Sequence, residues 1–175
     1  MDKDRRGIWF DIFKKHTANL INKNLSVLDI GCRDNYFDDK FKSLGFSWVG
    51  MDIAKGDGVS LKGRMEDIPL FDSSTAIIFS SHSFEHTTDP LKTLAEFSRV
   101  LRIRGLLIMI TPYCCEAQIL NMDKTHNFVL NDLQLVDLLN KSGFQIVDLY
   151  LDKTGEDDER EWVYVSVAVN VCKNG

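Results

Sequence analysis

The stretch Val27-Leu28-Asp29-Ile30-Gly31 decides the fold of this chain. A short, largely apolar strand runs straight into a glycine, and helical-looking sequence follows it. About 20 residues later a second apolar stretch, 48–51, ends on Asp52. Such a glycine lets the backbone approach a ligand, and an acid at the tip of the next strand accepts hydrogen bonds from ribose hydroxyls. The two strand ends therefore predict a nucleoside-binding edge of a parallel sheet.

Composition restricts the classes of protein to which the chain can belong. With 175 residues it is long enough for one core and too short for two full domains. Its net charge of -5 makes nucleic acid an unexpected partner. The longest apolar run, 106–110, is too short to cross a bilayer, so no membrane insertion is expected. The four cysteines form no CxxC pair and the amino terminus has no apolar signal core, so we expect reduced thiols and a cytoplasmic protein.

Strand and helix patterns alternate along the chain, and nothing in the sequence divides it into repeats or linked segments. Helical spacing or capping residues predict helices over 5–23, 35–44, 90–102 and 131–142, and apolar runs predict strands over 26–30, 47–52, 58–61, 75–80, 106–111, 144–151 and 161–172.

This order of elements predicts a fold class. Alternating strands and helices form a parallel sheet, but the link between the last two strands is too short for a crossover, so that pair must be antiparallel. The expected fold is a three-layer α/β sandwich with a Rossmann-like, mostly parallel seven-stranded sheet and a C-terminal antiparallel hairpin. We expect a single domain over 1–175, with an N-terminal helical segment at 1–24 and the core at 25–175.

Several motifs, in their order and spacing, resemble a known family. They are Val27-Leu28-Asp29-Ile30-Gly31-Cys32, Val49-Gly50-Met51-Asp52-Ile53, the stretch 63–69, the stretch 80–86 and Arg99-Val100-Leu101 before Gly105. Together they cover about residues 25–172 and are similar to small class I S-adenosylmethionine-dependent methyltransferases of the type 11-like group that acts on small molecules.

The resemblance implies roles for particular residues. It implies S-adenosylmethionine as cofactor, S-adenosylhomocysteine as product and a small or medium-sized molecule as methyl acceptor. The implied cofactor contacts are Asp29, Gly31, Cys32 and Arg33 for the methionine portion, Asp52 for the ribose, Ile53, Met65 and Glu66 for the adenine, and Ser81 for the methionine amino group. On the acceptor side the candidates are His82, His86, Tyr113 and His126.

Two departures from the family pattern leave an alternative open. The usual Gly-x-Gly-x-Gly turn reads Gly31-Cys32-Arg33-Asp34-Asn35, and Arg33 tolerates a left-handed backbone poorly. Its guanidinium could pair with the methionine carboxylate or obstruct the cofactor. Arg64 stands where the family often has Asp, and Glu66 offers a substitute acceptor for the adenine amino group. The alternative is a non-catalytic, methyltransferase-like binding or assembly module.

The segment from His82 to His86 also matches His-x-x-Glu-His, a zinc-protease signature. That interpretation needs a distant third ligand, for which Glu161 is a nominal choice. Because the methyltransferase resemblance explains the same residues, we expect no metal. His86 either lines the acceptor pocket or packs a helix start, and His126 is either a general base or a tether for its loop.

Overall fold

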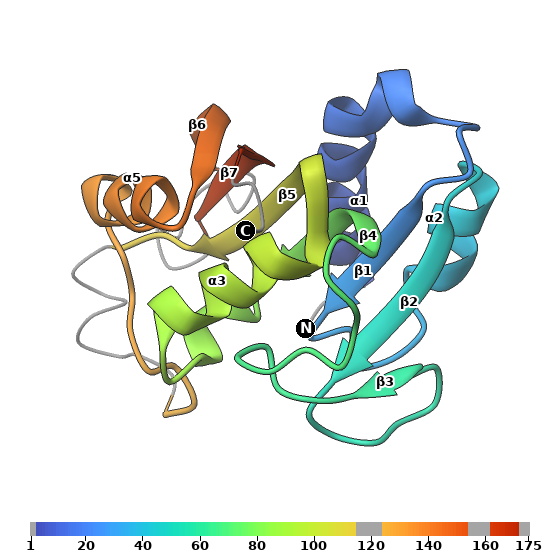
Figure 1. The fold of residues 1–175 in the computed structure, drawn as a ribbon, viewed down its shortest axis with the longest axis horizontal. Helices are drawn as coiled ribbons and strands as arrows, with labels where there is room; N and C mark the ends of the chain where they lie inside the picture. The colour runs from blue at the N-terminus through green and yellow to red at the C-terminus, as the bar shows by residue number, and fades with distance from the viewer. Residues whose placement is uncertain (1–2, 115–123, 154–161, 172–175) are drawn as a thin grey trace.

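The computed structural model describes residues 3–114, 124–153 and 162–171, which build a mixed sheet with helices on both faces (Figure 1). The expected fold class is confirmed. The strands are β1 (Ser26–Ile30), β2 (Ser47–Asp52), β3 (Leu61–Lys62), β4 (Thr75–Ser81), β5 (Leu101–Pro112), β6 (Phe144–Asp152) and β7 (Val163–Asn170).

The strand order of the sheet is β3-β2-β1-β4-β5-β7-β6. All pairs from β3 to β5 are parallel, whereas β7 lies between β5 and β6 and is antiparallel to both. The strand order reverses at β1, which has β2 on one side and β4 on the other. Ligands of open α/β sheets bind beyond the carboxyl ends of the strands at such a point. The topology therefore places the expected site at the ends of β1, β2 and β4.

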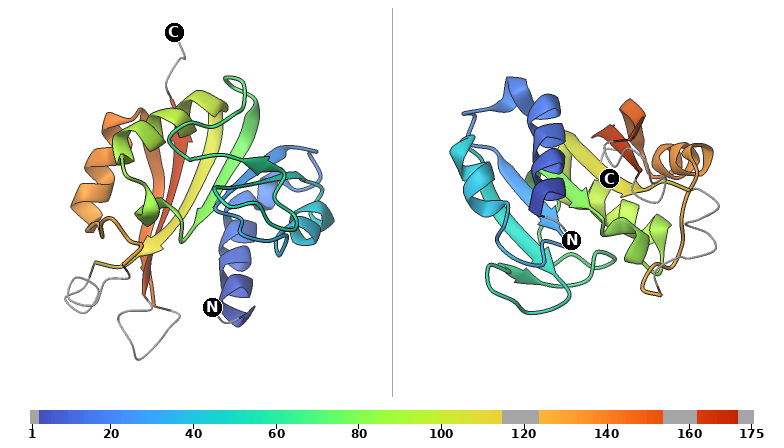
Figure 2. Two further views of the ribbon diagram at one scale, coloured as in Figure 1. Left: turned by 90° about the horizontal axis from the view of Figure 1, so that it is seen from below. Right: turned by 180° about the vertical axis from the view of Figure 1, so that it is seen from behind.

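Each face of the sheet has its own hydrophobic core. On one face α1 (Lys3–Thr17) and α2 (Asp38–Ser43) bury a largely aromatic cluster that includes Phe13, Phe41 and Phe79. On the other face α3 (Pro90–Val100) and α5 (Asp132–Lys141) pack mainly aliphatic side chains on the sheet. Figure 2 shows these two helical layers from two further sides. This arrangement is the three-layer sandwich.

Capping residues begin both helices of the second layer where the sequence predicts them. Asp89 accepts a hydrogen bond from the Lys92 amide and precedes Pro90 at the first helical position. Asn131 forms a capping box with Gln134. Both predicted helix starts are confirmed.

Other boundaries differ from the sequence prediction for local reasons. The helix expected at 35–44 begins at Asp38, because the Asp34 carboxylate accepts a hydrogen bond from the Tyr36 amide and holds a turn there. The strand expected at 58–61 is the shorter β3, because Gly58 adopts φ +86° in a preceding turn. The leading helix ends at Thr17, whose hydroxyl bonds to the Phe13 carbonyl, and a 3₁₀ turn, η1 (Ala18–Leu20), follows.

Some expectations fall outside the described residues, namely those on Cys115, Glu161, Cys172 and the two ends of the strand predicted at 161–172. Within the part of the chain that the structure describes, Cys32 and Cys114 do not form a disulfide. Among the described helices, none combines the length and apolar character needed to span a bilayer.

Candidate active site

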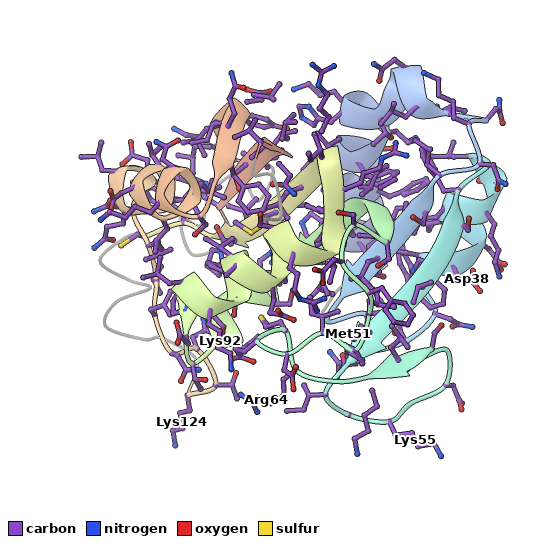
Figure 3. The ribbon with its side chains drawn as sticks, in the orientation of Figure 1. Asp38, Met51, Lys55, Arg64, Lys92 and Lys124 are labelled. Atoms are coloured by element: carbon purple, nitrogen blue, oxygen red, sulfur yellow. The ribbon has the colours of Figure 1, made fainter. Side chains whose placement is uncertain are left out.

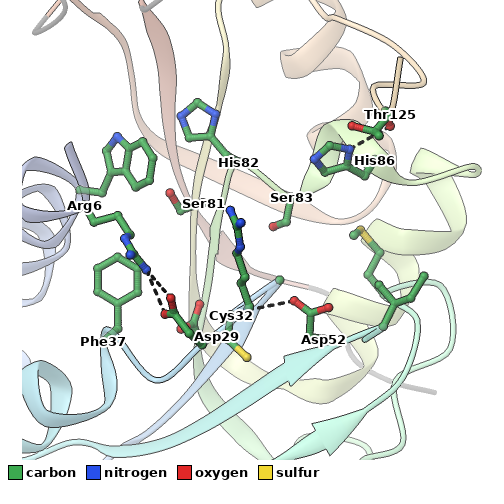
Figure 4. A pocket seen from close by; sticks show the side chains of 16 residues that line it. Arg6, Asp29, Cys32, Phe37, Asp52, Ser81, His82, Ser83, His86 and Thr125 are labelled. Carbon is green, nitrogen blue, oxygen red and sulfur yellow. Dashed lines mark hydrogen bonds and ion pairs between the residues drawn. The ribbon is translucent and has the colours of Figure 1, made fainter. Parts of the chain in front are cut away.

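A pocket of about 640 Å³ opens at the carboxyl ends of β1, β2 and β4. In the view of Figure 4 the carboxylates of Asp29 and Asp52 lie on one side of this pocket, opposite the imidazoles of His82 and His86. The residues that line it are Arg6, Trp9, Asp29, Gly31, Cys32, Arg33, Asp34, Phe37, Asp52, Ile53, Met65, Ser81, His82, Ser83, His86 and Thr125. The structure thus brings together eight of the nine expected cofactor contacts and two of the four acceptor-side candidates.

The turn after β1 is formed despite its departure from the family pattern. Gly31 has φ +72°, and a Cβ built there would lie 2.5 Å from the Cβ of Ser83. Only glycine therefore lets this turn approach the segment after β4. Arg33 adopts φ +58°, the left-handed conformation that the family pattern assigns to glycine. Its backbone amide donates to the Asp52 carboxylate over 2.9 Å, so the unusual residue keeps the turn attached to β2.

The Asp52 carboxylate is fixed at the tip of β2 by two backbone amides. Oδ2 accepts from the Arg33 amide and Oδ1 from the Ala54 amide, each over 2.9 Å. A carboxylate oxygen has two lone pairs, so each oxygen can accept a further hydrogen bond. This geometry suits an acid that receives two vicinal hydroxyls.

Asp29 is an acid buried in the wall of the pocket, with 2% of its surface exposed. Burial raises the pKa of Asp29 to about 7, while a hydrogen bond from the Trp48 indole over 3.2 Å acts in the opposite direction. Burial also raises the pKa of the neighbouring Cys32 thiol to about 12, with the Asp29 carboxylate adding to the shift. Cys32 is therefore a neutral, packed side chain, and Asp29 is the group whose charge a cationic ligand would favour.

The segment after β4 closes the pocket and is tied to β1. The Ser83 hydroxyl donates to the Ile30 carbonyl over 2.9 Å and lies 2.7 Å from the Ser80 hydroxyl. His82 has φ +48° and donates its amide to the Ile110 carbonyl. The Ser81 hydroxyl is buried without a hydrogen-bond partner in the described part of the chain. An orphaned polar atom in a pocket wall fits a ligand that carries a matching polar group.

Of the three residues expected near adenine, Ile53 and Met65 line the pocket, and Ile53 is 61% exposed. Glu66 is not part of the lining; its Oε1 instead accepts hydrogen bonds from the Thr87 hydroxyl and the Thr88 amide, over 2.7 and 2.9 Å. Burial alone would raise the pKa of Glu66, but these hydrogen bonds lower it to about 2. Glu66 thus fastens its loop to the segment before α3.

Arg64 does not enter the pocket either. Its guanidinium is about half exposed, lies near the Glu66 carboxylate and stands at the surface in Figure 3. The departure from the family pattern at position 64 therefore leaves the pocket open.

The acceptor-side candidates separate into two groups. His82 and His86 line the pocket, and His126 lies against it, with its ring centroid 4.9 Å from that of His86. Tyr113 packs instead against Trp162 and Tyr164 in the core above β7, at centroid distances of 5.6 and 5.4 Å. The structure does not bring Tyr113 to the pocket lining.

Six of the lining residues, Arg6 and Trp9 among them, were not among the sequence candidates, and neither was Glu85 beside the pocket. Arg6 of α1 makes a two-pronged ion pair with Asp34, at 2.9 Å to each oxygen. Trp9 lies over His82, with ring centroids 4.5 Å apart. The partners of Arg6 and Trp9 are distant in sequence, so no local sequence pattern predicts these two contacts. Glu85 is buried in the 3₁₀ turn η2 (Phe84–His86) after β4; in the sequence it belongs both to the family stretch 80–86 and to the His-x-x-Glu-His match.

Comparisons with known proteins identify a family to which the sequence is similar. A family model described as a methyltransferase domain matches residues 1–149. A Mycolicibacterium smegmatis protein named as a probable S-adenosylmethionine-dependent methyltransferase is 26% identical over 135 residues, which are 70% of this chain and 52% of that protein. A malonyl-[acyl-carrier protein] O-methyltransferase of Yersinia pestis is 34% identical over 95 residues, 49% of this chain and 36% of that protein.

One solved structure shares the fold of this chain over almost the whole length of the sequence. The YcgJ protein of Bacillus subtilis has a TM-score of 0.75 at 15% identity and covers 95% of this chain and 100% of its own. The chain spans only about half, or less, of the length of the curated relatives described above. Because the family model covers most of the sequence, the chain belongs to the methyltransferase domain family, as its motifs predicted.

Proposed function

We propose that this chain binds S-adenosylmethionine in the pocket and transfers its methyl group to a small or medium-sized acceptor. The observation that carries the proposal is the Asp52 carboxylate, which two backbone amides hold at the pocket while each oxygen keeps capacity for a ribose hydroxyl. The name of the Mycolicibacterium smegmatis relative, a probable S-adenosylmethionine-dependent methyltransferase, supports the choice of cofactor.

The pocket also fits the other end of this cofactor. The Asp29 carboxyl and the orphaned Ser81 hydroxyl are candidates to bind the methionine ammonium, since both are acceptors in the wall next to the Gly31 turn. Arg33 lines the same wall and can pair with the methionine carboxylate. Ile53 and Met65 offer apolar surface to the adenine.

The remaining residues prepare the acceptor. S-adenosylmethionine supplies an already activated methyl group, so the protein contributes mainly alignment, a dry pocket and a base for the acceptor proton. His86 is a candidate base: if its Nδ1–H donates to the Thr125 carbonyl over 2.9 Å, Nε2 carries the lone pair. His82 and His126 are the other candidates near the same wall.

The alternative, a non-catalytic module, depended on a damaged turn at Arg33 and on Arg64. The turn is formed and Arg64 lies outside the pocket lining, so neither residue supports the alternative. We also propose a cytoplasmic protein whose residues 1–175 act as one domain and whose acceptor is not a nucleic acid, in keeping with a net charge of -5.

Calorimetric titration with S-adenosylhomocysteine tests cofactor binding. We expect the unmodified chain to bind and Asp52→Ala to weaken the affinity by about 10- to 100-fold, the range for lost hydrogen bonds to a charged group. Asp57→Ala is the matched control, because this exposed acid of the following loop is not part of the pocket lining. If the folded chain binds neither S-adenosylhomocysteine nor S-adenosylmethionine, the proposed function is wrong.

A further inference from the structure

Glu85 is a buried carboxylate with no evident structural use. It lies in η2, directly after the pocket segment of β4, and is 2% exposed. Neither of its oxygens has a hydrogen-bond partner among the described residues. A buried ionised carboxylate that lacks hydrogen bonds is costly unless a cation compensates it. Glu66, an acid in a similarly buried position, has its hydrogen bonds satisfied, which makes Glu85 the exception.

Imidazoles surround this carboxylate. The chain has four histidines, and three of them lie close to Glu85. His82 Nδ1 is 3.5 Å and His126 Nε2 is 3.9 Å from Glu85 Oε1. One ligand atom each from Glu85, His86 and His126 lies within 4.8 Å of the others. Two imidazoles and one carboxylate form a donor set that divalent first-row metals prefer.

The loop that carries His126 is held against η2. The Asn127 amide donates to the Glu85 carbonyl over 2.9 Å, and the Asn127 side chain donates to the carbonyls of His86 and Thr87. His86 Nδ1 lies 2.9 Å from the Thr125 carbonyl. A metal-binding histidine commonly donates its second ring N–H to a backbone carbonyl, which fixes the ring and directs the other nitrogen to the metal. His86 already has this arrangement.

We propose that Glu85, His86 and His126 bind a divalent first-row metal ion, of which Zn²⁺ fits the donors best. Ligand atoms about 2.0–2.1 Å from a tetrahedral zinc are about 3.3 Å apart, so the site must contract from its present spacing. The backbone segments that carry the three ligands are already joined by hydrogen bonds, so this contraction is assigned to the side chains. The ligand set differs from the zinc-protease signature, in which the two histidines are the ligands and Glu is the base.

The site is at the wall of the cofactor pocket. His86 and Thr125 are part of the pocket lining, and so is His82, whose ring lies against that of Trp9. Three protein ligands leave a fourth position of a tetrahedral ion open. If the proposed function is right, that position can receive an acceptor oxygen and favour its deprotonated form. Metal binding itself does not depend on the proposed function.

Titration of the chelator-treated full chain with Co²⁺ tests the proposal by absorption spectroscopy. We expect one equivalent to give the d–d bands of a nitrogen- and oxygen-bound ion, without a thiolate charge-transfer band, and Zn²⁺ to abolish them by displacement. The substitutions Glu85→Gln, His86→Asn and His126→Asn should each weaken Co²⁺ binding by more than about 10-fold. Mutation of a residue that only supports a metal ligand already lowers affinity by at least about that factor, and these substitutions remove the ligands themselves.

His16→Asn is the matched control, because His16 lies near Tyr150 and Asp148, away from the cluster. It should leave the Co²⁺ spectrum unchanged. Thermal unfolding and S-adenosylhomocysteine binding, measured on the same samples, show whether each variant is folded and whether the proposed function holds. Absence of d–d bands from the folded, unmodified chain would overturn the metal site, as would bands that survive all three substitutions. If the folded, unmodified chain gives the Co²⁺ bands but does not bind S-adenosylhomocysteine, only the proposed function is wrong.

Discussion

Asp29 combines an ionisable group with near-complete burial at the pocket wall. Its pKa is about 7 in the folded chain and near 3.8 when the chain is unfolded. Between these two pH values the carboxyl therefore holds a proton in the folded state and is ionised in the unfolded state. The stability contributed by this proton is fully present below the unfolded pKa and is lost as pH rises through the folded pKa. The shift sets an upper limit of about 4 kcal/mol on that loss.

Asp29→Asn should therefore raise the melting temperature relative to the unmodified chain at pH 8, with a gain that shrinks toward pH 4. Asparagine keeps an acceptor for the Trp48 indole but has no charge to bury. The same change should weaken S-adenosylhomocysteine binding at pH 8, because a cationic ammonium prefers the carboxylate. Melting curves and calorimetry across this pH range measure both effects. An equal melting temperature for the two proteins at every pH would show that the carboxyl is not desolvated.

Gly31 makes a second prediction at the residue scale. Gly31→Ala places a Cβ 2.5 Å from the Ser83 Cβ and forces alanine into φ +72°, a conformation that alone costs about 1–2 kcal/mol. We expect a loss of at least about 2 kcal/mol in the free energy of unfolding and weaker S-adenosylhomocysteine binding. Gly7→Ala is the control: it meets no heavy atom within 4 Å and alanine favours the helix. Equal denaturation midpoints for the two variants would contradict the close approach.

At the scale of elements, long-range polar contacts hold the loops that surround the pocket. The Glu66 carboxylate joins the loop after β3 to the segment before α3, and Asn127 joins the loop before α5 to η2. In both cases one side chain satisfies several groups of a distant segment. The pocket is therefore shaped by loops fastened to one another as well as by the strand ends.

Glu66→Gln tests the first of these connections. Replacing a charged acceptor of two strong hydrogen bonds should cost about 1–3 kcal/mol in unfolding free energy at pH 7. Because the folded pKa of Glu66 is lowered from 4.5 to about 2, its contribution is present above pH 4.5 and lost as pH falls toward 2. The difference from the unmodified chain should vanish over that range. Chemical denaturation at several pH values measures it, with the exposed neighbour Asp67→Asn as control.

Sequence patterns sufficed where the structure depends on neighbouring residues. The buried strand 75–80, the caps at Asp89 and Asn131 and the acid at the tip of β2 are all encoded within a few positions. Contacts between distant residues were missed, because periodicity carries no information about them. Arg6 and Asp34 are 28 positions apart, and Glu66 and Thr88 are 22 apart. The sequence prediction for Glu66 consequently followed the family pattern, whereas the folded chain uses this residue to join two loops.

At the scale of the whole molecule, the sheet divides into two parts with different uses. The parallel part, β3 to β5, ends at the pocket, while the antiparallel strands β7 and β6 extend the core on the far side. The pocket-lining residues come from α1, the strand ends of the parallel part and the loops after them. A ligand in the pocket should therefore stabilise one part of the molecule more directly than the other.

Binding of S-adenosylhomocysteine at 100 times its dissociation constant should stabilise the folded chain by about 2.7 kcal/mol. For a chain of this size that corresponds to a rise of about 5–10 °C in melting temperature. In native-state hydrogen exchange, we expect the added protection to concentrate in the turn after β1, the tip of β2 and the segment 81–86, because these carry the pocket groups. In β6 the ligand should slow only those amides that exchange through global unfolding of the chain, because no residue of this strand lines the pocket. Protection that is strongest in β6 and β7 would place the nucleoside elsewhere on the molecule and remove Asp52 from the proposed site.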